Sequence, residues 1–157
     1  YYNSLTSKAQ NQIVQHDWSI GKITEGNNNL ISQIDEENST KWSGEIGLIT
    51  ASEYIRANSN IKKCGNFNLE ANNKKECSNT NWMLNIIDIP KTNYFWTITA
   101  YNNSIYSIAL ISGDDYDYGL VYTDFDIHNP FLPVLYLSPN IKITGGTGTQ
   151  NDPYTIE

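Results

Sequence analysis

Length and charge set the first limits on this protein. The chain has 157 residues, enough for one domain with its own core, and 10 Lys or Arg stand against 17 Asp or Glu. The net charge of −7 argues against a nucleic-acid partner, because a phosphate backbone requires a basic surface. Apolar runs fall short of the roughly 20 residues that cross a membrane. We therefore expect a single exported domain over residues 1–157, whose signal or membrane anchor lies upstream of Tyr1.

The N-terminal part of the chain predicts one helix and one strand before a polar segment. Residues 1–15 have the apolar spacing of a short amphipathic helix, and Ser4 can cap it. Alternating apolar residues predict a first strand at 17–24. Residues 25–41 are polar with few apolar positions, which predicts a connector containing about one helical turn.

Two local patterns follow in the middle of the chain. Thr50 and Glu53 have the spacing of a capping box, which predicts a second short helix through Arg56. Cys64 and Cys77 flank a polar loop that packing alone would hardly order. A disulfide there would remove roughly 3 kcal/mol of loop entropy from the unfolded chain. The favoured expectation is this disulfide, and two free thiols are the alternative.

Residues 94–137 predict the sheet around which the domain is built. Short alternating apolar runs are separated by Tyr- and Asp-rich turns, a pattern typical of strands. Residues 131–137 are nearly continuously apolar and predict a central buried strand. Further strands are expected at 81–84 and 141–144. The pattern indicates an α+β domain with two short helices flanking a twisted, mostly antiparallel sheet.

The turns of this sheet have the composition of a recognition surface. Tyrosine gives a large contact area at low entropy cost, and asparagine and aspartate add hydrogen-bonding groups. The candidate ligand-binding residues are Trp96, Tyr101, Asn102, Asn103, Tyr106, Asp114, Asp115, Tyr116, Asp117, Tyr118 and Tyr122. For the other tryptophans, Trp18, Trp42 and Trp82, a core position is the expectation and sugar stacking the alternative.

Metal-binding and catalytic chemistry receive little support. Asp114, Asp115 and Asp117 are a weak calcium candidate, because their spacing departs from the calcium-loop pattern and a solvated acidic turn explains them as well. His16 and His128 each lie near an aspartate, but neither has a nucleophile motif beside it. We therefore expect a non-enzymatic domain with no catalytic residues and no cofactor, calcium being the one alternative.

Several motifs resemble those of a known family. They are Trp-Met-Leu at 82–84, Trp-Thr-Ile-Thr at 96–99, a Gly-Asp turn at 113–114 and Pro-Val-Leu-Tyr-Leu at 133–137. Residues 1–10, 42–49 and 140–154 also look like this group. In this order they resemble C-type-lectin-like domains of Bacillota surface proteins, in the formylglycine-generating-enzyme-like branch of that fold. The resemblance covers nearly the whole chain.

The resemblance implies a C-type-lectin-like fold and a binding role at the cell surface. Similar domains often follow a type IV prepilin-like helix, which implies a pilin-like head that recognises a protein or glycan. The chain departs from the family at Leu132, where an arginine is usual, and the catalytic cysteines and the calcium-lectin sugar motifs have no counterpart. The alternatives are a structural subunit of a type IV pilus-like filament and, less favoured, an enzyme of the formylglycine-generating branch.

Overall fold

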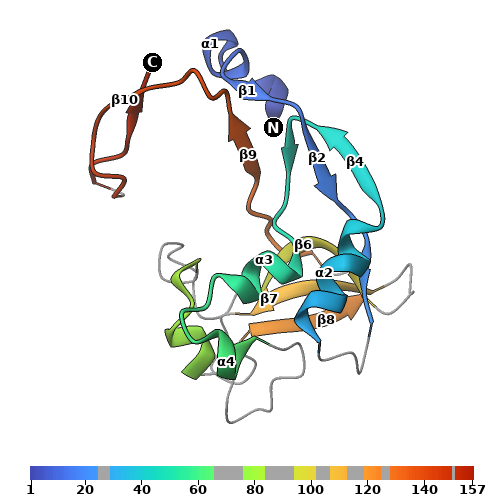
Figure 1. The fold of residues 1–157 in the computed structure, drawn as a ribbon. Helices are drawn as coiled ribbons and strands as arrows, with labels where there is room; N and C mark the ends of the chain where they lie inside the picture. The colour runs from blue at the N-terminus through green and yellow to red at the C-terminus, as the bar shows by residue number, and fades with distance from the viewer. Residues whose placement is uncertain are drawn as a thin grey trace.

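The computed structural model describes residues 1–24, 29–65, 76–83, 94–101, 107–112, 119–124, 128–149 and 151–157. Within these ranges the protein is a mixed α+β fold with short helices and small, mainly antiparallel sheets (Figure 1). The predicted α+β class is confirmed.

The largest sheet has four strands in the order β3-β6-β7-β8. They are β3 (Lys22–Ile23), β6 (Tyr94–Tyr101), β7 (Ser107–Ser112) and β8 (Gly119–Asp124). Strands β6, β7 and β8 are antiparallel neighbours, whereas β3 joins the outer edge of β6 in parallel. The register of β6 against β7 shifts between Trp96 and Ala100, which marks a bulge. The strands predicted after residue 94 are therefore present.

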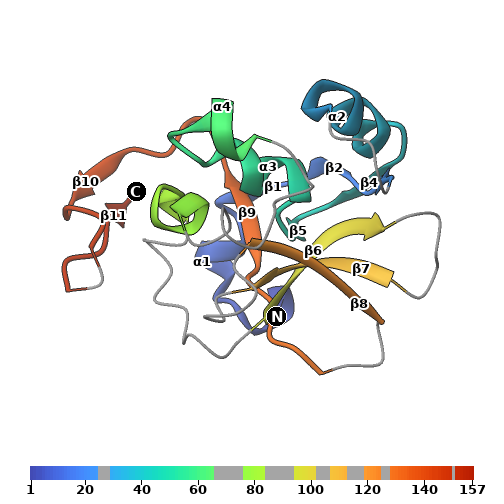
Figure 2. The same ribbon diagram turned by 90° about the horizontal axis from the view of Figure 1, so that it is seen from below.

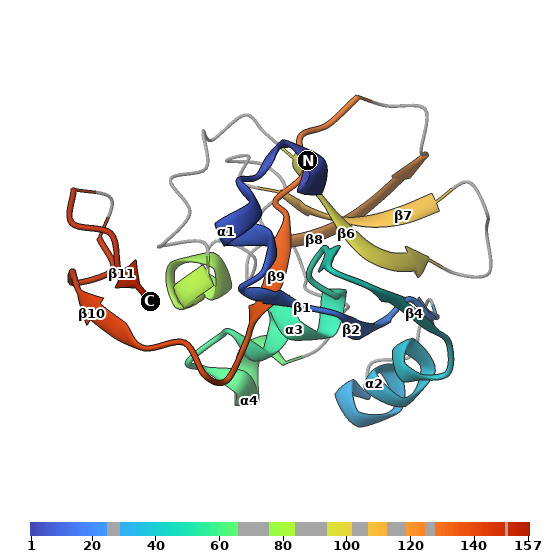
Figure 3. The same ribbon diagram turned by 90° about the horizontal axis from the view of Figure 1, so that it is seen from above.

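The remaining N-terminal strands and β9 (Val134–Leu137) form two further small sheets outside the four-stranded sheet. Strand β9 lies between β1 (Ile13–Val14) and β5 (Ile46–Gly47), and β2 (His16–Ser19) pairs with β4 (Lys41–Gly44). Figure 3 shows the N-terminal segment beside β9. The prediction of a buried strand at 131–137 is wrong in part: β9 is central, but Tyr136, Leu137 and Phe131 are exposed. Its neighbours β1 and β5 pair with β9 along its edges and leave its faces uncovered.

The N-terminal segment does not form the predicted single helix over 1–15. It forms a 3-10 turn η1 (Tyr2–Ser4), a short helix α1 (Ser7–Gln10) and then β1. Leu5 has an extended backbone between the two turns, and Thr6 rather than Ser4 caps α1 by accepting from the Ala9 amide at 3.3 Å. Pairing of β1 with β9 then excludes a continuous helix.

Helices α2 and α3 follow; the local sequence pattern predicts α3 correctly but not α2. Helix α3 (Ala51–Arg56) starts at Thr50 with both capping-box hydrogen bonds, so that prediction is confirmed. The segment predicted as a connector instead contains the nine-residue helix α2 (Leu30–Asn38). The Asn29 side chain caps α2 by accepting from the Ser32 amide at 3.1 Å. The predicted strand at 17–24 is present as two pieces, β2 and β3.

Residues around the disulfide form the remaining helical turns. Helix α4 (Ile61–Cys64) and a turn at 76–79 bring the two cysteines together. The predicted strand at 81–84 is wrong for its described part: Asn81 forms an isolated bridge with Asn58, and Trp82 and Met83 are helical. The Asn81 side chain donates to the Tyr54 carbonyl at 2.7 Å, which holds this segment on α3 instead of beside a strand.

The core lies between the four-stranded sheet and the helices α2 and α3, which cover one side of it (Figure 2). Phe95, Thr97 and Thr99 alternate along β6 and are buried toward these helices. Two small clusters fill the layer, and Leu120 packs against both. One is built on Ile23 and Ala51, and the other on Tyr54 and Ile55.

The chain ends in a hairpin at one end of the molecule (Figure 1). It pairs β10 (Ile143–Gly145) with β11 (Thr155–Ile156), so the strand predicted at 141–144 and the following Gly/Thr turn are present with shifted bounds. Gly146 has a φ of +82°, and a Cβ there would lie 2.1 Å from the Pro153 carbonyl oxygen. A turn of this geometry requires glycine.

We expect Gly146→Ala to loosen the hairpin selectively. The left-handed backbone costs about 1–2 kcal/mol for an L-residue, and the contact with Pro153 adds to it. Faster amide hydrogen exchange at 143–145 and 155–156, with unchanged exchange in β6, would show the effect. Gly145→Ala is the matched control, since a Cβ there meets only the Thr155 hydroxyl at 3.9 Å. Equal behaviour of the two variants would contradict this account.

Candidate functional site

Most of the predicted ligand-binding residues lie outside the described residues. These are Asn102, Asn103, Tyr106, Asp114, Asp115, Tyr116, Asp117 and Tyr118. The weak calcium candidate of Asp114, Asp115 and Asp117 is among them. Tyr122 lies on β8, and Trp96 and Tyr101 lie on β6. The predicted recognition surface and the predicted calcium site therefore both stay predictions.

Trp96 and Tyr101 are both half-buried but have different surroundings. Tyr101 packs against the core cluster of Ile23 and Ala51. Trp96 alternates with the buried Phe95 and therefore points to the other face of β6.

The neighbouring Phe131, which the sequence predicts to be buried, is exposed and joined to Trp96 through the backbone. The Trp96 amide donates to the Pro130 carbonyl at 3.2 Å, and Phe131 bridges Trp96 in parallel. The Phe131 side chain is 57% exposed. Single exposed apolar side chains are common on protein surfaces, so Phe131 by itself indicates no binding site.

The structure also brings together aromatic residues from three strands, β2, β4 and β9. We call His16, Trp18, Trp42 and Tyr136 the aromatic cluster. The Tyr136 ring stacks on His16 with centroids 3.9 Å apart and lies 5.4 Å from the Trp18 ring. Trp18 and Trp42 are direct cross-strand partners on β2 and β4, so they share one face of this pair. The cluster therefore joins the β2-β4 ribbon to β9.

Two glycines make room for the indole rings. A Cβ on Gly47 would lie 2.4 Å from the Trp18 ring, and a Cβ on Gly44 would lie 2.2 Å from the Trp42 ring. The Trp18 indole nitrogen also donates to the Gly44 carbonyl at 2.9 Å. Both indoles thus lie directly on backbone, which fixes their orientation. Trp18 is only 4% exposed, whereas Trp42 is 48% exposed.

The opposite face of the β2-β4 ribbon is polar. The Ser43 hydroxyl donates to the Asp17 carboxylate, and the Lys41 ammonium donates to the Ser19 hydroxyl at 2.7 Å and to Asn38 at 2.8 Å. The ribbon therefore separates a solvated polar face from an aromatic face whose outer rings, Trp42 and Tyr136, remain exposed. Exposed rings held in fixed orientations bind a ligand at a reduced entropy cost.

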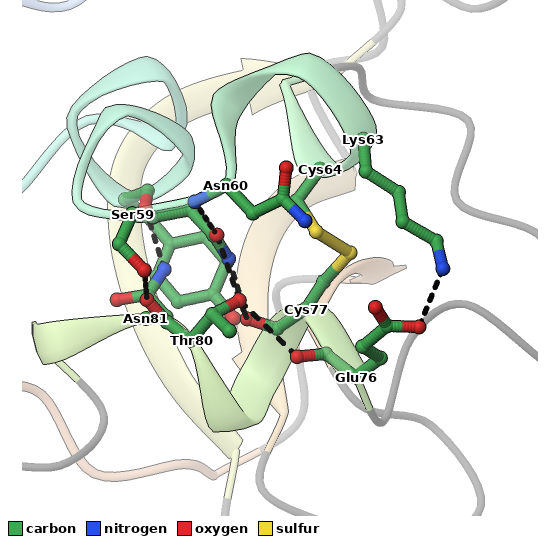
Figure 4. Close-up of a disulfide and its surroundings, with 10 residues drawn as sticks. Ser59, Asn60, Lys63, Cys64, Glu76, Cys77, Thr80 and Asn81 are labelled. Carbon is green, nitrogen blue, oxygen red and sulfur yellow. Dashed lines mark hydrogen bonds and ion pairs between the residues drawn. A yellow bond between two sulfur atoms is a disulfide. The ribbon is translucent and has the colours of Figure 1, made fainter.

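The disulfide predicted between Cys64 and Cys77 is present (Figure 4). Both cysteines are buried. The Asn58 side chain donates to the Cys77 carbonyl at 2.5 Å, and the Lys63 ammonium pairs with the Glu76 carboxylate nearby. These contacts fasten both ends of the loop between the two cysteines. A disulfide is typical of proteins in oxidising compartments.

Titratable groups give little sign of catalysis in the described part of the chain. Burial raises the pKa of the Tyr54 phenol, against a smaller lowering by the Ser78 hydrogen bond. The His16 ring stacks on the Tyr136 ring, and His128 is exposed. Across the described ranges, no three His, Cys, Asp or Glu side chains gather where they could hold a metal ion. Nor is any described helix long and apolar enough to span a membrane.

Comparison of the chain with protein-family models, with curated proteins and with solved structures finds no match.

Proposed function

We propose that this protein is a non-enzymatic binding domain exposed at the cell surface, with a C-type-lectin-like fold, which recognises a protein or glycan ligand. The exposed aromatic cluster carries the proposal. Trp42 and Tyr136 are exposed; the Tyr136 ring stacks on His16, and the buried Trp18 is the cross-strand partner of Trp42. Tryptophan and tyrosine of this kind dominate binding energy at recognition sites. The disulfide supports an extracellular location.

The aromatic cluster suits a ligand with both apolar and polar groups. Each exposed side chain offers a ring face and a polar edge, the indole N–H of Trp42 and the hydroxyl of Tyr136. A sugar ring has the same combination, and so does an aromatic-rich peptide. The tyrosine-rich surface predicted near Tyr101 is a second contact region of the same proposed domain, and its contribution is separable by mutation.

We expect Trp42→Ala to weaken ligand binding by about tenfold or more, as loss of roughly 1.4 kcal/mol or more at a central aromatic contact implies. The measurement is binding of the purified domain to glycan and protein arrays, followed by titration of the strongest ligand. Trp82→Ala is the matched control, because Trp82 is similarly exposed at 55% but lies outside the aromatic cluster. Equal losses in both variants, with both folded, would refute a role for the cluster.

The same arrays test the predicted tyrosine-rich surface and the predicted calcium site separately. A variant with Tyr101, Tyr106, Tyr116 and Tyr118 changed to alanine tests the tyrosine-rich surface. Arrays run with calcium and with chelator test whether Asp114, Asp115 and Asp117 hold a metal.

A structural subunit of a pilus-like filament is the second candidate. The terminal hairpin favours it, since Ile143 and Tyr154 are exposed there and a two-stranded hairpin alone is marginally stable in water. Contact with a neighbouring subunit would cover both side chains. Absence of any array ligand, together with assembly of a chain that carries an upstream prepilin-like helix, would favour this reading over recognition.

A further inference from the structure

Helix α2 packs on the rest of the domain through polar side chains. Gln33 and Glu37, one turn apart on the same face, are 0% and 1% exposed. Ile31 is 72% exposed on the outer side, and Ile34 is half-buried. A surface helix usually turns its apolar stripe inward. Among the described side chains of α2, hydrogen bonds therefore contribute more to docking than apolar burial does.

Gln33 holds the start of α2 against the end of β3. Its amide nitrogen donates to the Thr24 carbonyl at 2.8 Å, and the Thr24 amide donates to the Gln33 side-chain oxygen at 3.1 Å. One turn further on, the Gly21 amide donates to the Glu37 carbonyl at 2.9 Å. None of these bonds uses a titratable side chain, so they form whether or not the Glu37 carboxyl is protonated.

The Glu37 carboxyl group joins α2 to both α3 and β6. It accepts from the Ser52 amide at 3.3 Å, from the Ser52 hydroxyl and from the Thr99 hydroxyl at 2.6 Å. The Thr99 oxygen accepts in turn from the Ala51 amide at 2.9 Å. One titratable group therefore lies at the meeting point of three elements. A hydroxyl can donate or accept, so Ser52 and Thr99 can partner both the charged and the neutral carboxyl.

The electrostatic surroundings of Glu37 contain no compensating ion pair in the described part of the chain. The described charged side chains on the elements in contact with α2 are Lys22 on β3, Glu53 and Arg56 on α3, Lys41 on β4 and Asp17 on β2. Of these, Lys41 donates to Asn38 and Asp17 accepts from Ser43. Glu53 is bound to the Thr50 amide in the capping box. Within α2 itself, Asp35 is exposed and Glu36 accepts from the Thr24 hydroxyl at 2.6 Å. Burial of Glu37 without a cation penalises its charged form.

We propose that α2 is a proton-sensitive latch, which docks most firmly while the Glu37 carboxyl is protonated and detaches more readily once that group is ionised. Thr99, which holds the latch on β6, lies two residues before Tyr101, the first tyrosine of the predicted contact surface. Release of α2 would therefore alter how that surface is presented. This last link depends on the proposed function, whereas the latch itself does not.

The direction of the pH dependence follows from burial. Desolvation raises the pKa of Glu37 above its ordinary value of 4.5, against smaller lowering by the Ser52 and Thr99 hydrogen bonds. The docked state thus binds the proton more tightly than the open state does. Its stabilisation from this group is complete below pH 4.5 and declines as pH rises through the raised pKa.

Amide hydrogen exchange of α2 between pH 4 and pH 8 tests the latch, with rates corrected for the intrinsic pH dependence of exchange. In the wild-type chain the opening constant of α2 should rise with pH, tenfold for each unit by which burial raises the pKa. Glu37→Gln keeps the shape and stays neutral, so its opening constant should be flat. Asp35→Asn removes an exposed charge from the same helix and should behave as wild type.

A second variant covers the case in which Glu37→Gln folds poorly. Thr99→Val removes one donor to the charged carboxylate and the acceptor of the Ala51 amide, so it should increase α2 opening at every pH and more strongly at high pH than at low pH. Equal pH dependence in wild type and Glu37→Gln, or opening of α2 only on global unfolding, would overturn the latch. Ligand titrations across the same pH range test the link to recognition separately, since failure to find any ligand would count against the proposed function and leave the exchange result intact.

Discussion

Replacement of Trp18 by alanine is expected to lower the free energy of unfolding by about 3–5 kcal/mol, the range for a buried tryptophan. The Trp18 ring packs on Gly47 and contacts the rings of His16 and Tyr136, and its indole nitrogen donates to the Gly44 carbonyl. Alanine would leave a cavity between the β2-β4 ribbon and β9, and a carbonyl without this donor.

Urea unfolding followed by far-UV circular dichroism measures this loss. Trp82→Ala is the matched control, because that ring is largely exposed and surface substitutions usually change stability by less than about 0.5 kcal/mol. A loss below about 1 kcal/mol for Trp18→Ala would mean that the ribbon is not held by this cluster.

Removal of the disulfide by a Cys64→Ser, Cys77→Ser double substitution should cost about 3 kcal/mol, the loop-entropy value for a short closed loop. The cysteines are 13 residues apart. In the entropic account, loss of the disulfide lets the unfolded chain expand and expose more surface. The free energy of unfolding should therefore fall more steeply with urea concentration as well. Lys63→Ala, which removes the exposed pair with Glu76, should cost less than about 1 kcal/mol. An unchanged unfolding midpoint in the double variant would contradict the prediction.

Local sequence patterns identified the elements whose cause is local. The capping box at Thr50 and Glu53 fixed α3 because both of its hydrogen bonds lie within four residues. The Cys64–Cys77 pairing followed from loop context. Alternating apolar residues after residue 94 also predicted strands, and β7 and β8 are present there.

The errors arose where distant contacts decide the structure. Helix α2 buries Gln33 and Glu37 instead of an apolar stripe, so its pattern resembled a connector. Residues 1–15 have helical spacing, but pairing with β9 more than 120 residues later forces β1.

The aromatic cluster also depends on distant pairings. His16 and Trp18 meet β4 and β9 only in the folded chain. The glycines beneath the indoles were the one local signal, and they carry meaning only once the pairing is known.

Those glycines also define a way to recognise distant relatives. The indoles of Trp18 and Trp42 need bare backbone at Gly47 and Gly44, respectively. A substitution at either glycine should therefore be tolerated in evolution only together with a smaller residue at the tryptophan it supports. The spacing Trp-x-Gly-x-x-Gly at 42–47, with another tryptophan 24 positions before Trp42, is therefore the pattern to look for in distant relatives. Chains that retain it would share the ribbon even where their loops have diverged completely.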